Sequence, residues 1–74
     1  MSLENLEKVR EYLVKQRDAV AAEAADDIER GYEAPAKKTI QALISVQETI
    51  EKVDRAIADT SKPGSYNYGL LNNL

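Results

Sequence analysis

The sequence predicts an all-α fold: an antiparallel two-helix hairpin that completes a helical bundle by oligomerisation and ends in an irregular C-terminal tail. Apolar residues recur at spacings of three and four along two long segments, as on one face of an α-helix. The segment Gly31–Pro35 separates them, and so short a link makes neighbouring helices antiparallel. A chain of 74 residues without Cys has neither a large core nor disulfides, which leaves oligomerisation as the route to stability.

The first helix is expected to run from about residue 3 to residue 30. Ser2 is of a type that commonly caps a helix N-terminus, and Glu4 follows in the first turn, where the helix dipole favours negative charge. Gly31 suits the left-handed position that ends a helix. The two end signals therefore agree with the extent of the apolar pattern.

The second helix is expected to run from about residue 36 to residue 59. Pro35 fits the first turn of a helix, where its missing N–H is not needed. The segment Thr60–Gly64 combines residues that stop a helix. The chain therefore divides into a helical hairpin, residues 1–62, and an uncharged C-terminal tail, residues 63–74.

The two helices carry more apolar surface than one hairpin is expected to cover. An apolar seam with heptad spacing follows the second helix, and Ile40 and Ile44 lie to one side of it. This excess predicts a homo-oligomer, a dimer or higher, such as a four-helix bundle. The residues predicted to form the oligomer interface are Leu6, Leu13, Val20, Ala24, Ile40, Leu43, Val46, Ile50, Val53 and Ile57.

Two arginines interrupt the apolar stripe of the first helix. Arg10 and Arg17 lie seven residues apart near its middle. An unpaired buried charge is so costly that each guanidinium must pair with a carboxylate, extend to water or bind an anionic ligand. Asp54 and Asp59, toward the seam of the second helix, are candidate partners. The sequence thus leaves open an ion pair that sets the helix register, snorkelling to water, and an anion site.

Five carboxylates gather around the end of the first helix. Carboxylates suit calcium or magnesium, but the alternation and the glycine of an EF-hand loop are missing. Charge clusters are usually hydrated surface, so we expect a solvated face that holds no metal ion. The residues are Glu23, Asp26, Asp27, Glu29 and Glu33.

The C-terminal tail has a composition unlike that of a solvated terminus. No charged side chain follows Lys62, and the tail contains tyrosines and leucines separated by Gly and Asn. Such side chains can anchor a segment to a protein surface. The alternative is a loose terminus. The residues predicted to dock on a partner, or on the hairpin itself, are Tyr66, Tyr68, Leu70, Leu71 and Leu74.

The composition argues against several functions. Without His or Cys the chain lacks the usual general base, nucleophile and metal ligands, and its three Gly residues form no phosphate-binding loop, so we expect no enzyme and no cofactor. A net charge of −3 makes a nucleic acid an unlikely partner. The start of the chain has no signal-peptide pattern and no apolar run could span a membrane, so we expect a cytoplasmic protein without a membrane partner.

These observations predict a non-enzymatic protein–protein interaction module: a small oligomeric adaptor, assembly component or inhibitor that binds itself and another protein. Two alternatives stay open, a binder of an anionic small molecule such as a nucleotide at a subunit interface, and a structural component of a virion or other large assembly. In outline the chain resembles small dimeric helical-hairpin regulators of plasmid copy number, which pair two hairpins into a bundle. That resemblance covers the hairpin plan and no binding residue, so it implies a bundle but no RNA binding.

Overall fold

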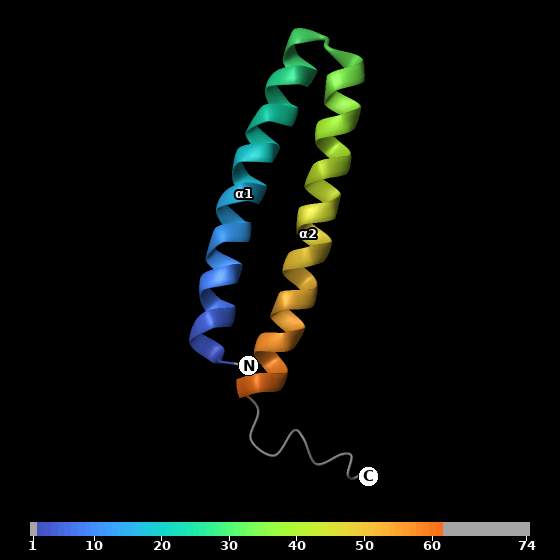
Figure 1. The fold of residues 1–74 in the computed structure, drawn as a ribbon. Coiled ribbons are helices and arrows are strands. Elements are labelled where there is room, and N and C mark those ends of the chain that lie inside the picture. The colour runs from blue at the N-terminus through green and yellow to red at the C-terminus, as the bar shows by residue number, and fades with distance from the viewer. Residues whose placement is uncertain (1, 62–74) are drawn as a thin grey trace, which may run out of the picture.

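The computed structural model describes residues 2–61, which form two long helices joined by a tight turn (Figure 1). α1 spans Leu3–Arg30 and α2 spans Glu33–Ser61. The helices lie side by side and run in opposite directions, so the start of α1 lies beside the end of α2 (Figure 1). The predicted all-α antiparallel hairpin is confirmed.

Both ends of α1 are capped as the sequence predicts. The Ser2 hydroxyl accepts a hydrogen bond from the Asn5 N–H at 3.3 Å, which satisfies one of the free donors of the first turn. Gly31 has the left-handed conformation, with φ 76° and ψ 20°. Its N–H donates to the Ile28 carbonyl at 3.1 Å, and the Tyr32 N–H donates to the Asp27 carbonyl at 2.9 Å. This pair of bonds is a Schellman motif, which stops the helix and reverses the chain.

α2 begins earlier and ends later than the predicted residues 36 and 59. It starts at Glu33, so the turn between the helices is Gly31 and Tyr32 rather than five residues. Pro35 does not delay the start, because the first turn needs no N–H from it, and the Ala36 N–H already donates to the Tyr32 carbonyl at 2.9 Å. The helix continues through Ser61, whose hydroxyl donates to the Ile57 carbonyl at 2.9 Å.

The helices meet along a seam. In each helix the seam residues follow one another at alternating intervals of three and four. Ile50 is 1% exposed and is the most deeply enclosed large side chain among the described residues. Arg10 bonds to Asp54 and Arg17 to Gln47, so a step of seven residues up α1 matches a step of seven down α2. The buried or half-buried seam residues are Leu6, Arg10, Leu13, Arg17, Val20, Ala24 and Asp27 in α1, and Ala36, Thr39, Leu43, Val46, Ile50, Val53 and Ile57 in α2.

Candidate interaction surface

Most of the residues predicted to form an oligomer interface lie in the seam within one hairpin. Leu6, Ala24 and Ile50 are buried between α1 and α2. The half-buried members of the set are Leu13, Val20, Leu43, Val46, Val53 and Ile57. They are used first to hold the two helices of one chain together, and their contact with a second chain stays a prediction. Ile40 is the member of the set that the hairpin leaves exposed.

Arg10 reaches across the seam to Asp54. Its Nε donates to Oδ1 at 2.5 Å and its Nη2 to Oδ2 at 3.5 Å, a two-point contact between guanidinium and carboxylate. This hydrogen bond, followed by the negative charge of Asp54, raises the pKa of the Arg10 guanidinium above its ordinary value. The side chains remain 43% and 46% exposed, so the pair contributes little to stability, and its predicted role in setting the helix register stays a prediction.

Arg17 makes a different contact, with an amide rather than a carboxylate across the seam. Its Nη1 donates to Gln47 Oε1 at 3.2 Å, and its Nε lies 3.4 Å from the neighbouring Asp18 on α1. Gln47 in turn donates from Nε2 to Glu51 at 3.2 Å. The guanidinium is therefore engaged on both sides.

One polar pair in the seam was not anticipated from the sequence. The Thr39 hydroxyl is placed 3.1 Å from Asp27 Oδ2 and 2.8 Å from the Pro35 carbonyl, and Thr39 is buried. Asp27, expected to be solvated with its acidic neighbours, is half-buried and accepts this bond. The signal was available, since Asp27 follows Ala24 by three residues and so continues the seam spacing of α1.

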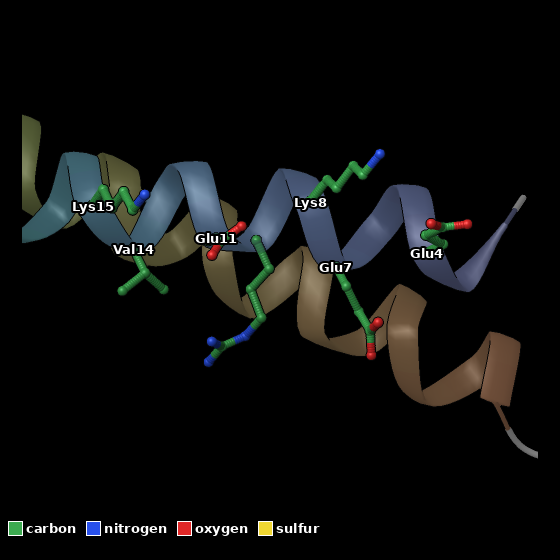
Figure 2. Close-up of a pocket in the computed structure, with 7 residues that line it drawn as sticks. Glu4, Glu7, Lys8, Glu11, Val14 and Lys15 are labelled. Carbon is green, nitrogen blue, oxygen red and sulfur yellow. The ribbon is translucent and has the colours of Figure 1, made fainter.

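The two arginine contacts mark one side of the hairpin. Arg10 lines a shallow depression with Glu7, Glu11 and Val14 of α1. Figure 2 shows Glu7 and Val14 pointing to the α2 side of α1, whereas Lys8 points away. Arg10 bonds to Asp54 of α2, so the depression and Asp54 lie on the same side of the hairpin.

A second depression continues this side on α2. It is lined by Leu43, Ile44, Gln47, Glu48 and Glu51. Since Gln47 is the residue that binds Arg17, the depression belongs to the same side of the molecule as the arginine contacts. Residues seven apart in a helix share a side, which adds the rest of the surface. We call it the arginine face; it comprises Glu7, Val14, Ala21 and Ile28 of α1 and Lys37, Ile40, Ile44, Gln47, Glu51 and Asp54 of α2.

The arginine face exposes three isoleucines. Ile28 of α1 is 60% exposed, and Ile44 and Ile40 of α2 are 53% and 38% exposed. The opposite side exposes Val9 and Tyr12 near the start of α1. These three partly exposed isoleucines give the arginine face an apolar surface, and apolar surface is stabilised when another chain removes it from water.

Other predicted features lie outside this surface. The tail residues from Tyr66 to Leu74 lie outside the described residues. Within residues 2–61, no three acidic side chains are grouped so that they could hold a metal ion. Neither helix in that range has a stretch long and apolar enough to cross a membrane.

Comparison of the chain with family models, curated proteins and solved structures finds no match. Its function is therefore inferred from its own residues.

Proposed function

We propose that the protein is a non-enzymatic interaction module that associates with itself and acts through protein contacts, as a small adaptor, assembly component or inhibitor. The observation that carries this proposal is the exposure of Ile28, Ile40 and Ile44 together on the arginine face. Fully burying one such side chain stabilises a complex by about 1.5–3 kcal/mol, so covering three that are partly exposed contributes roughly 1 kcal/mol each.

The narrow core of the hairpin supports the same proposal. Among residues 2–61 the buried apolar side chains are Leu6, Ala24, Ala36 and Ile50, and two of these are alanines. A core of that size gives a hairpin only marginal stability, and the helices of such proteins gain most of their stability from packing. A second chain on the arginine face would extend this core without any change in the fold.

The alternative of an anion-binding site has less support, because its arginines are already engaged. Arg10 binds Asp54 and Arg17 binds Gln47 and Asp18. An anionic ligand would have to displace a carboxylate that lies within hydrogen-bonding distance of the guanidinium. The virion or large-assembly alternative depends on the tail and stays a prediction, as does a cytoplasmic location.

Sedimentation equilibrium from about 1 to 100 μM tests the proposal. We expect a dimer or larger species, and a melting temperature by circular dichroism that rises with protein concentration because association stabilises the folded chain. A stable monomer with a melting temperature independent of concentration over that range would contradict it.

A further inference from the structure

A stripe of three residues on the arginine face would pair with the same three residues of an antiparallel second copy. Lys37, Ile44 and Glu51 follow one another at intervals of seven along α2, and all three are exposed. The stripe therefore reads positive, apolar, negative, with Ile44 at its centre. Turned end for end, it presents a negative charge opposite its own positive charge and Ile44 opposite Ile44.

The neighbouring stripe of α1 has its centre at nearly the same height. Arg17 bonds to Gln47, so Ala21, four residues further along α1, lies within about one residue of the height of Ile44, three residues back along α2. Val14 and Ile28 lie seven residues on either side of Ala21. From Val14 to Ile28 this second stripe is apolar, and Glu7 continues it toward the start of α1. Its smallest side chain, Ala21, lies at the centre of the apolar part, where a facing helix can approach closely.

We propose that a second copy of this chain covers the arginine face through a twofold axis that runs across both helices, past Ala21 of α1 and Ile44 of α2. This deepens the proposed function and rests on it. The axis lies across the helices, so the two hairpins run in opposite directions and each stripe faces the same stripe of the other copy. Lys37 then meets Glu51 of the second copy, twice by symmetry, while Ile44 meets Ile44, and Val14 meets Ile28.

The resulting assembly is a four-helix bundle in which every pair of neighbouring helices is antiparallel. α1 packs beside α1 of the second copy and α2 beside α2, and the hairpin already makes α1 and α2 antiparallel (Figure 1). Antiparallel neighbours also place the N-terminus of one helix near the C-terminus of the next, which is the favourable arrangement of helix dipoles.

Other occupants fit the charges of the face less well. A twofold axis along the hairpin would set α2 on α1 of the second copy, with Lys37 opposite Ile28 and Glu51 opposite Val14, so that both charges lose water without a partner. A foreign helix of one charge sign would pair with Lys37 or with Glu51 but repel the other. The antiparallel second copy satisfies both.

Charge exchange tests the pairing in the full chain. Lys37→Glu alone, or Glu51→Lys alone, places like charges opposite each other at both symmetric contacts, and we expect the dissociation constant to rise about tenfold or more. A mixture of the two variants restores opposite charges at both contacts and should form heterodimers in preference to homodimers. The double variant should regain wild-type affinity. Lys38→Glu, the same charge change one residue away from the stripe, is the matched control and should leave affinity unchanged.

Cysteine cross-linking tests the position of the axis, since the chain has no Cys of its own. A residue beside a twofold axis lies close to its own symmetry mate, so Ile44→Cys should form a disulfide-linked dimer on mild oxidation. Lys37→Cys should cross-link with Glu51→Cys in a mixture but slowly with itself. Thr49→Cys, on the other side of α2, is the control and should not cross-link.

The outcomes separate this proposal from the proposed function. Preferential heterodimers together with the Ile44→Cys cross-link support the antiparallel twofold bundle. A wild-type dimer that is indifferent to Lys37→Glu, or that cross-links through Thr49→Cys instead, overturns this arrangement while self-association stands. A wild-type chain that is monomeric at 100 μM overturns both.

Discussion

The two helices contribute different kinds of side chain to the seam. α2 supplies a nearly continuous apolar row from Leu43 to Ile57, whereas α1 interrupts its row with Arg10, Arg17 and Asp27 at the same spacing. The apolar row provides burial but would tolerate a shift by one heptad, because each step presents a similar side chain. Each polar residue of α1 contacts one partner on α2, and a shifted register would break these contacts. We therefore predict that the apolar row of α2 provides most of the attraction and that the polar residues of α1 set the alignment.

Replacing Ile50 by Asp is expected to have the largest effect, because it breaks the apolar row at its most buried point. The side chain is 1% exposed, and the variant loses its packing and gains a buried charge without a partner. We expect destabilisation by about 4 kcal/mol or more, enough to unfold the chain, measured as loss of the helical circular dichroism signal. Val9→Asp, at an exposed position of α1, is the control and should keep its helicity. An Ile50→Asp variant that stays helical would refute the assignment of the core.

Replacing Thr39 by Val removes the polar contact that closes the seam near the turn. The single Thr39 hydroxyl proton is shared between Asp27 Oδ2 and the Pro35 carbonyl, so the change leaves a half-buried carboxylate without this shared donor. We expect a loss of about 1–2 kcal/mol in urea unfolding. The matched control is Thr49→Val, which removes a hydroxyl that bonds only to the Ser45 carbonyl of its own helix, among the contacts described, and should cost less. Equal costs would show that the Asp27 contact adds nothing.

The helix ends could be predicted from the sequence better than the side-chain partners across the seam. The ends of α1 were predictable because Ser2 and Gly31 act through their own local hydrogen bonds. The start of α2 was placed three residues late because the whole first turn tolerates a proline, so Pro35 does not mark the first helical residue. Asp27 was assigned to the surface by its charge, although its spacing placed it in the seam. Side-chain partners across helices depend on register, which composition does not reveal.

Replacing Arg17 by Leu makes the row of α1 resemble that of α2. The position is half-buried and its partner across the seam, Gln47, is neutral, so the loss of the contact strands no charge on α2. We expect a gain in stability of about 1 kcal/mol from added burial, together with a less uniform assembly, because polar seam residues restrict register and oligomer state. Lys15→Leu, at an exposed position, controls for added hydrophobicity. A variant that is less stable than the wild type would contradict this expectation. So would a variant that sediments as a single species with a boundary as narrow as that of the wild type, because Arg17 would then not be needed to restrict the register.

The smallest expected effect concerns Arg10 and Asp54, where a double-mutant cycle separates alignment from ligand binding. Because the pair is about half exposed, the coupling between Arg10→Ala and Asp54→Ala should be about 0.2–1 kcal/mol at low salt and should shrink in 1 M NaCl. Because the pKa of Arg10 is raised, the stability that its own protonation contributes is present below its ordinary pKa and is lost as pH rises through the raised pKa, so the titration of Arg10 adds no pH dependence near neutrality. If the arginine instead serves an anion, Arg10→Ala should leave melting unchanged and abolish a thermal shift produced by added nucleotide. A coupling energy between Arg10 and Asp54, with no rise in the wild-type melting temperature on adding nucleotide, would assign Arg10 to helix alignment. A nucleotide-induced rise in melting temperature without a coupling energy would assign it to ligand binding.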